Sequence, residues 1–253
     1  MLTIEERLKT FARLNNSLLP TPVHRLDWLS DEYGVNVYCK RDDLTGFGFG
    51  GNKTRKLDFL LPEALDLGCD TLIAIGANQS NFCRMAAAYG TACNMEVHLV
   101  LGGSEPAGPT GNLRLDHLLK VTCHHVDSAD WGDWAGEAEK LDEQLTSRGG
   151  KVYRMPVGGS TPRGALGYVA AFAEIMADQS LLGVEFDAII HASSSAGTQA
   201  GLVVGKAVSG WSGSIIGIDV AKTRAVLEKE VLDLARATAA EIGAYVDSSS
   251  VVV

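Results

Sequence analysis

Residues 71–101 read TLIAIGANQSNFCRMAAAYGTACNMEVHLVL, and this stretch decides the fold. Runs of apolar and β-branched residues at 71–75 and 96–101 predict two buried strands. Between them, apolar residues recur at three- and four-residue spacing over 80–89, which predicts a helix. A strand, a helix and a strand in this order predict a parallel pair with the helix packed across it.

The same alternation extends in both directions along the chain, so we expect an α/β fold of two three-layer α/β/α domains with mostly parallel sheets. Glycine-rich crossings at 46–51 and 158–164 bracket a block that we interpret as a small α/β domain, residues 53–159. The large domain then comprises residues 1–52 and 160–253, with a ligand cleft between the two domains. Further strands are expected at 35–40, 151–156, 188–192 and 214–220, and further helices at 54–67, 112–120, 134–147, 164–179, 198–207 and 222–242.

Composition excludes several classes of protein. A net charge of −9 with scattered Lys and Arg lacks the basic footprint of a nucleic-acid-binding protein. Residues 1–18 intersperse charged and apolar side chains, so they predict neither a signal peptide nor a membrane span. Five cysteines without a CxxC pair are typical of a reducing compartment. We therefore expect a cytoplasmic protein that binds no nucleic acid and no membrane.

The segment GFGFGGNKTRKL at 46–57 places a lysine at the start of a predicted helix. Glycines let the backbone approach a ligand closely, and the free N–H groups at a helix start favour an anion. Burial beside the cationic Arg55 and Lys56 would make the Lys53 amine lose its proton more easily. A neutral amine can form a Schiff base with an aldehyde cofactor. The alternative is that these side chains only decorate a solvated first turn.

Two further strand-to-helix junctions carry candidate binding groups. Ser80 and the amides that follow it are suited to hold a carboxylate, although serine is also an ordinary helix N-cap. Residues 190–201, IHASSSAGTQAG, run from an apolar strand through a Ser/Gly/Thr loop into a helix. Such a loop is either a phosphate cradle or a plain turn, and it has neither the P-loop nor the dinucleotide glycine pattern.

Together, these segments closely resemble the fold-type II pyridoxal 5′-phosphate (PLP) enzymes of the 1-aminocyclopropane-1-carboxylate deaminase and D-cysteine desulfhydrase group, whose fold is like that of tryptophan synthase β. The resemblance runs from about Leu19 to Ile242. The motifs that carry it are PTP at 20–22, KRDDLTG at 40–46, GGNKTRKL at 50–57, QSN at 79–81 and GTQAG at 197–201.

The resemblance implies a role for each candidate residue. Lys53 is expected to bond covalently to PLP and then to act as a base, with Ser80 as a second catalytic group that shuttles protons. Asn81 is expected near the 3′-oxygen of the cofactor, and Lys56 near its phosphate. The residues expected at the cofactor are Lys53, Asn81, Lys56, Ser195, Ala196, Gly197 and Thr198, and those expected at the substrate are Ser80, Asn81, Phe82 and Gly159.

The choice of small amino-acid substrate depends on stretches that point to different branches of the group. Residues 54–72 resemble the deaminases, whereas 108–116 and 156–160 resemble the desulfhydrases. Because the latter stretches are less shared between the branches, the sequence favours β-elimination from D-cysteine, giving pyruvate, sulfide and ammonia. The alternative is deamination of 1-aminocyclopropane-1-carboxylate to 2-oxobutyrate and ammonia. Phe82 departs from both branches, which carry a polar residue or histidine after the asparagine.

The end of the chain supports a third reading. The sequence stops at Val253, soon after the helix expected to end near Ile242, whereas the family continues with a segment that brings an active-site tyrosine and groups beside the pyridine nitrogen. A truncated, weakly active or inactive PLP-binding protein is therefore also predicted, and residues 251–253 form a candidate unpaired strand. The resemblance implies a homodimer. Adjacent His124 and His125 point to opposite faces of a strand, so we expect no metal site there.

Overall fold

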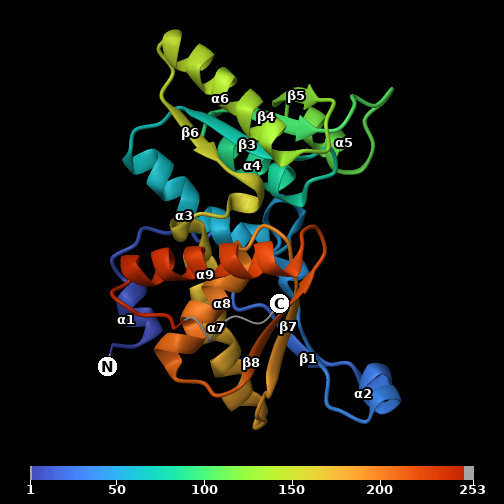
Figure 1. Cartoon of the computed structure of the whole chain (residues 1–253), viewed down its shortest axis with the longest axis vertical. Coiled ribbons are helices and arrows are strands. Elements are labelled where there is room, and N and C mark those ends of the chain that lie inside the picture. Colours follow the sequence, from blue (N-terminus) through green and yellow to red (C-terminus); the bar gives the residue numbers. More distant parts are fainter. Residues whose placement is uncertain (1, 248–253) are drawn as a thin grey trace.

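The computed structural model describes residues 2–247, which form two lobes stacked along the long axis of the molecule (Figure 1). The upper lobe in Figure 1 is built on one parallel sheet with the strand order β5-β4-β3-β6. Its strands are β3 (Thr71–Ala77), β4 (Glu96–Gly102), β5 (Thr122–Val126) and β6 (Val152–Met155).

Helices cover both faces of this sheet because successive side chains of its central strand point to opposite sides. Leu72 and Ala74 pack with α3, α4 and α5, whereas Ile73 and Ile75 pack with α6. The upper lobe is therefore a three-layer α/β/α unit. The helices are α3 (Lys53–Asp66), α4 (Asn81–Ala92), α5 (Gly111–Leu118) and α6 (Trp131–Ser147).

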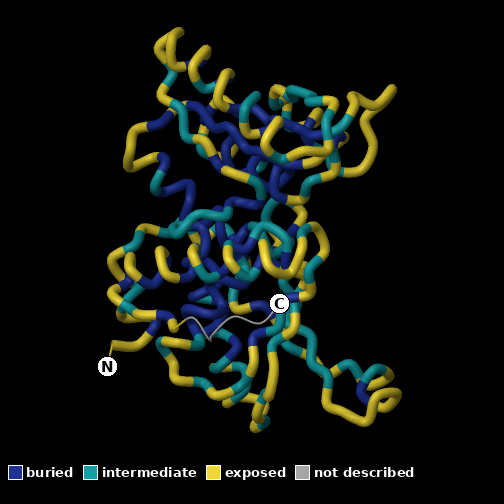
Figure 2. The backbone as a smooth tube through the Cα atoms, viewed as in Figure 1, coloured by how far each residue is buried: buried dark blue, intermediate teal, exposed yellow. Residues whose placement is uncertain are grey.

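The lower lobe pairs two parallel strands and packs helices against one of their faces. Ile215 is buried in that core, but Ile190 and Ile218 on the opposite face are 65% and 52% exposed. Figure 2 shows this contrast as exposed strand backbone beside a buried helical interior. The elements are α1 (Ile4–Leu8), α7 (Pro162–Leu182), β7 (Ala188–Ser193), α8 (Gly197–Ser209), β8 (Ser214–Asp219) and α9 (Arg224–Glu241).

An arm between α1 and α3 departs from the parallel pattern. Its strands β1 (Val23–Arg25) and β2 (Tyr38–Lys40) are antiparallel, and α2 (Asp27–Tyr33) projects beside them (Figure 1). The buried strand expected over 35–40 is therefore wrong in two respects: β2 begins only at Tyr38, and the residues before it are not buried. Gly34 ends α2 in the left-handed conformation, and Val35 is 57% exposed. Three short 3₁₀ helices complete the described chain: η1 (Asp42–Thr45), η2 (Phe47–Phe49) and η3 (Val157–Gly159).

The order of the long elements agrees with the sequence predictions, and the expected α/β class with parallel sheets is confirmed. Among the α-helices and strands, the elements that the sequence patterns missed are α1, α2, β1 and β5. Each has seven residues or fewer, too few for a clear periodicity. The domain boundaries at 53 and 159 stay a prediction, and the strand expected at 251–253 lies outside the described residues.

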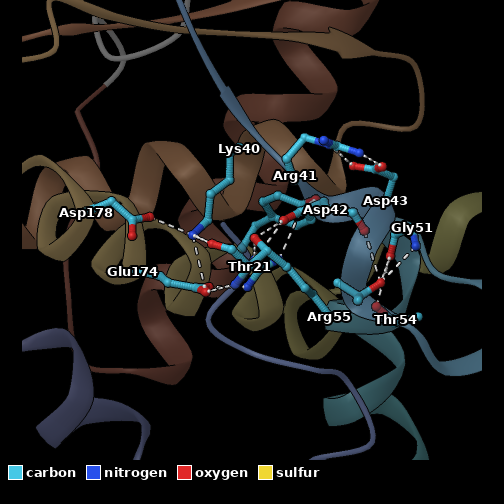
Figure 3. Close-up of polar contacts among 12 residues, drawn as sticks. Thr21, Lys40, Arg41, Asp42, Asp43, Gly51, Thr54, Arg55, Glu174 and Asp178 are labelled. Carbon is cyan, nitrogen blue, oxygen red and sulfur yellow. Dashed lines mark hydrogen bonds and ion pairs between the residues drawn. The ribbon is translucent and has the colours of Figure 1, made fainter. Parts of the chain in front are cut away.

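The buried guanidinium of Arg55 joins α3 to the arm and to α7 (Figure 3). Arg55 is 1% exposed and makes two hydrogen bonds to the Asp42 carboxylate, of 2.9 Å from Nε and 2.7 Å from Nη2. Its Nη1 donates to Glu174 on α7 at 2.5 Å, and Nη2 also donates to the Thr21 hydroxyl at 3.0 Å. One side chain therefore fixes three segments that are distant in sequence.

A second cation completes this network from the other side of Glu174 (Figure 3). Lys40 Nζ lies 2.6 Å from Asp178 and 3.3 Å from Glu174, and it donates to the Thr21 carbonyl at 2.7 Å. Burial alone would raise the pKa of Asp42, but the hydrogen bonds and charge of Arg55 hold that pKa below its ordinary value. Arg55 thus favours the ionised form of the Asp42 carboxylate that holds it in place.

We expect Arg55→Met to lower the free energy of unfolding by about 3–5 kcal/mol near neutral pH, because it leaves Asp42 and Glu174 as partly uncompensated buried charges. The folded-state pKa of Asp42 is depressed, so the stabilisation is present above the pKa of the unfolded carboxyl and is lost as pH falls through the folded value. Urea unfolding of the apoprotein at several pH values measures both effects.

The matched control is Arg41→Met. Arg41 makes an ion pair with the exposed Asp43 next to the same network, so its loss should change stability little. Equal destabilisation by the two substitutions, or a cost of Arg55→Met that does not shrink in acid, would contradict the role assigned to Arg55.

Candidate active site

Three helix starts supply the candidate site: Lys53 begins α3, Asn81 begins α4 and Gly197 begins α8. Lys56 of α3 donates from Nζ to the carbonyl of Gly158 in η3 at 3.0 Å. Free N–H groups at helix starts favour anions, so the arrangement suits a ligand with more than one acidic group.

Lys53 is partly buried, and burial lowers the pKa of its ammonium group to about 8. A substantial fraction of this amine is therefore neutral near physiological pH, as nucleophilic chemistry requires. The expected contribution of Arg55 to this effect is wrong, because the guanidinium of Arg55 is held by Asp42 and Glu174. Desolvation of Lys53 causes the shift instead.

Lys56 is fully buried one turn beyond Lys53. Burial, together with the charge of Lys53, lowers the pKa of Lys56 well below its ordinary value. The start of α8 lies very close to it: a Cβ atom on Gly197 would stand 2.7 Å from Lys56 Nζ and 2.8 Å from Ser160 Oγ. The structure thus brings Lys56 to the loop that the sequence singled out for phosphate.

That loop contains a strained turn. Ala196 has φ 66° and ψ −36°, and the Gly197 N–H donates to the Ser195 carbonyl at 2.8 Å. This is close to a classic γ-turn, which is rare for residues with a side chain and costs conformational energy. Ser160 stabilises the turn, since it donates to Ser195 Oγ at 2.9 Å and accepts from Gly197 N–H at 3.3 Å. Such strain is characteristic of functional loops.

Ser80 is the N-cap of α4, and its hydroxyl oxygen accepts the Cys83 N–H at 3.1 Å. The capping alternative is therefore confirmed. Gly76 on β3 makes room for this geometry, because a Cβ atom there would stand 2.5 Å from Ser80 Oγ. The capping role uses the oxygen as an acceptor only, so the hydroxyl hydrogen remains for a further acceptor.

The two residues that follow Ser80 differ in their burial. Asn81 is exposed at the start of α4, whereas Phe82 is 1% exposed and belongs to the upper core. A Cβ atom on Gly159 would stand 2.8 Å from the Phe82 ring, so the two residues are in close contact. Any influence of Phe82 on a substrate would therefore pass through Gly159.

Two buried polar atoms on β7 have no hydrogen-bond partner within the described chain: His191 Nε2 and Ser193 Oγ. Burial lowers the pKa of His191, and the charges of Lys56 and Lys53 lower it further, which places the imidazole near both lysines. Unpaired buried polar atoms are costly unless a ligand satisfies them. The sequence analysis assigned neither residue, although a histidine in an otherwise apolar strand was a visible signal.

The adjacent histidines His124 and His125 on β5 contact different partners. His124 Nε2 lies 3.0 Å from His98 Nδ1, whereas His125 Nδ1 lies 2.9 Å from Asn78 Oδ1. Within residues 2–247, no three His, Cys, Asp or Glu side chains are grouped as metal ligands. None of the helices in that range combines the length and apolar character needed to cross a membrane.

Comparison with known proteins identifies what this geometry is similar to. The family model "Pyridoxal-phosphate dependent enzyme" matches residues 14–252. The 1-aminocyclopropane-1-carboxylate deaminase of Methylobacterium nodulans is 38% identical over 253 aligned residues, covering 96% of this chain and 75% of the relative.

Solved structures agree with this similarity. The crystal structure of a homologue of ACC (1-aminocyclopropane-1-carboxylate) deaminase superposes on this chain with a TM-score of 0.92. The two chains are 36% identical, and the match covers 98% of this chain and 74% of that one. The threonine deaminase of T.th. gives a TM-score of 0.63 at 19% identity, covering 85% of this chain and 62% of that one, which supports the fold alone.

We expect acetic anhydride to acetylate Lys53 of the apoprotein at a rate that rises with pH and levels off above about pH 8, where the amine is mostly neutral. Lys229 is the internal control, because its hydrogen bond with Asp233 raises its pKa and its rate should still climb at higher pH. Peptide mass spectrometry follows both lysines in one sample. Parallel profiles for Lys53 and Lys229 would contradict the lowered pKa.

Proposed function

Because the chain belongs to the family of pyridoxal-phosphate dependent enzymes, we propose that it deaminates 1-aminocyclopropane-1-carboxylate to 2-oxobutyrate and ammonia. The likeness to a named deaminase over 96% of the chain is the observation that carries this proposal. The sequence analysis favoured D-cysteine, but the comparisons support its deaminase alternative better. We therefore reverse the order of the two substrates.

The residues of the site fit PLP. The cofactor carries an aldehyde, a phosphate and a ring with polar atoms, and the structure offers a counterpart to each. Lys53 supplies an amine whose pKa is about 8, and the start of α8 beside Lys56 supplies donors for a phosphate. His191 Nε2 and Ser193 Oγ are buried polar atoms that a ligand can satisfy.

The phosphate is proposed to lie at the loop from Ser195 to Thr198, where backbone N–H groups point out of the start of α8. Lys56 adds a nearby positive charge when it is protonated. Its lowered pKa favours the neutral form without a ligand, and a phosphate dianion would raise that pKa again. We therefore propose that a bound phosphate stabilises the protonated form of Lys56.

The substrate carboxylate is proposed to lie at the start of α4. The first N–H groups of a helix have no partner within the helix and attract an anion. Ser80 frames this position, and its hydroxyl is proposed to turn from the Cys83 side chain to donate to the carboxylate. Asn81, exposed beside it, is proposed to contact the 3′-oxygen of the cofactor.

When bound, PLP supplies an electron sink for the substrate, and the protein supplies orientation and proton transfer. Lys53 is proposed to hold the cofactor through its Nζ atom. Whenever Lys53 Nζ is not bonded to the cofactor, it would accept or donate a proton at the substrate, since its pKa is close to the working pH. Ser80 is the second proposed proton carrier, because its hydroxyl lies at the start of the same carboxylate-binding helix.

D-cysteine elimination and a weakly active PLP-binding protein remain the two other readings, and the product assay below separates them from deamination. A homodimer also stays a prediction, which rests on the resemblance.

We expect the wild-type protein with PLP to show the visible absorption of bound cofactor and to release 2-oxobutyrate from 1-aminocyclopropane-1-carboxylate. Lys53→Met should abolish both, because it removes the proposed covalent anchor. Lys140→Met is the control, since Lys140 lies on the exposed face of α6. Pyruvate and sulfide from D-cysteine alone would assign the other substrate, and bound cofactor without either product would contradict both activities.

We expect Gly197→Ala to weaken PLP binding by roughly tenfold or more, because the added methyl group displaces Lys56 and Ser160 from the phosphate position. Gly136→Ala in α6 is the matched control, because a Cβ atom there meets nothing within 4 Å. Titration of each apoprotein with PLP measures the change. Equal affinities of Gly197→Ala and wild type for PLP would contradict the proposed position of the phosphate at this loop.

A further inference from the structure

The start of α5 is clamped to the Gln79–Asn81 loop by four hydrogen bonds. Gln79 donates from Nε2 to the Thr110 carbonyl at 3.1 Å and accepts the Asn112 N–H at 2.9 Å. Asn112 Nδ2 donates to the Gln79 carbonyl at 2.8 Å and to Asn81 Oδ1 at 2.9 Å. Gln79 thus caps α5, whose own N-cap residue Thr110 makes no side-chain cap.

Glycine at position 111 permits this clamp. Its φ is 52°, and a Cβ atom there would stand 2.5 Å from Gln79 Oε1. A side chain would therefore push out the oxygen that caps α5. The Gly111-Asn112 pair, which the sequence analysis used only to compare branches of the family, has a structural purpose at the site.

Asn112 also sets the direction of the Asn81 amide. An asparagine amide has an acceptor end and a donor end. The acceptor end of Asn81 receives Asn112 Nδ2 at 2.9 Å and, more weakly, Arg84 Nη2 at 3.4 Å. With two donors at Oδ1, the Nδ2 group of Asn81 is left to face a ligand as a donor.

We propose that Asn112 is a positioning residue, which holds the Asn81 amide so that its NH₂ group donates to the 3′-oxygen of the cofactor. The inference rests on the proposed function, because it requires PLP beside Asn81. A donor at this position stabilises the ionised oxygen, whereas an acceptor would repel it. The two hydrogens of Asn112 Nδ2 are both used, one on the backbone of the loop and one on Asn81.

The test is Asn112→Asp, which keeps the shape of the side chain but replaces its donor by an acceptor. The Asn81 amide then turns to donate to the introduced carboxylate and presents its own Oδ1 to the cofactor. We expect PLP affinity to fall roughly tenfold, as for a hydrogen bond lost at a charged group. The pH midpoint of the spectrum of the bound cofactor should rise by about one unit for the same reason.

Arg114→Gln is the charge-matched control. Arg114 is exposed on α5, and its replacement also changes the net charge by −1. Hydrogen exchange of the apoprotein checks that the clamp still folds, because Asn112→Asp retains the backbone N–H that bonds to Gln79. Equal spectral midpoints for Asn112→Asp and Arg114→Gln would overturn the proposal.

Asn81→Ala separates positioning from a merely structural effect. If Asn112 acts through Asn81, Asn112→Asp should cause no further shift of the midpoint when residue 81 is alanine. An undiminished shift in that background would also overturn the proposal.

The spectral readout needs no turnover. A wild-type protein that binds PLP but releases neither product would refute the proposed deamination and still test Asn112. A wild type that binds no PLP would overturn both.

Discussion

The ion pair between Arg55 and Asp42 is the interaction on which the rest of the site depends. It fixes the rotation of α3 about its axis, because the buried guanidinium must meet Asp42, Glu174 and Thr21 together. Residues three apart on a helix share a face, so Lys53 and Lys56 then lie on a different face of α3 from Arg55. The pairing of Arg55 on one side of α3 thereby determines where Lys53 and Lys56 lie on the other side.

This arrangement gives three neighbouring cations different electrostatic environments. Arg55 is buried with carboxylates and keeps its charge, whereas Lys53 and Lys56 are buried without them and have lowered pKa values. Burial of an unpaired amine is unfavourable for the free protein. A phosphate and an aldehyde would reduce that cost in different ways. The phosphate would pair with a protonated amine, whereas the aldehyde would react with a neutral one. The desolvation that destabilises the free protein would therefore favour the binding of PLP at the proposed site.

The long elements could be predicted because their periodicities are local. β3, α4 and β4 begin and end within three residues of the expected ranges, and Lys53, Ser80 and Gly197 were found at the starts of helices. The role of Arg55 was missed, because its partners Asp42 and Glu174 are 13 and 119 residues away. Asn112 and His191 were missed for the same reason, since each gains its importance from residues on other elements.

The sequence alone determined the α/β order, the glycine-rich helix start with Lys53 and the Ser/Gly/Thr loop before α8. These features depend on neighbours along the chain, whose spacing the sequence states directly. Only the tertiary structure decided which cation is paired with carboxylates, which amines have a lowered pKa and which end of the Asn81 amide accepts from Asn112. Those properties depend on desolvation and on hydrogen-bond partners from other elements, and both exist only after the chain has folded.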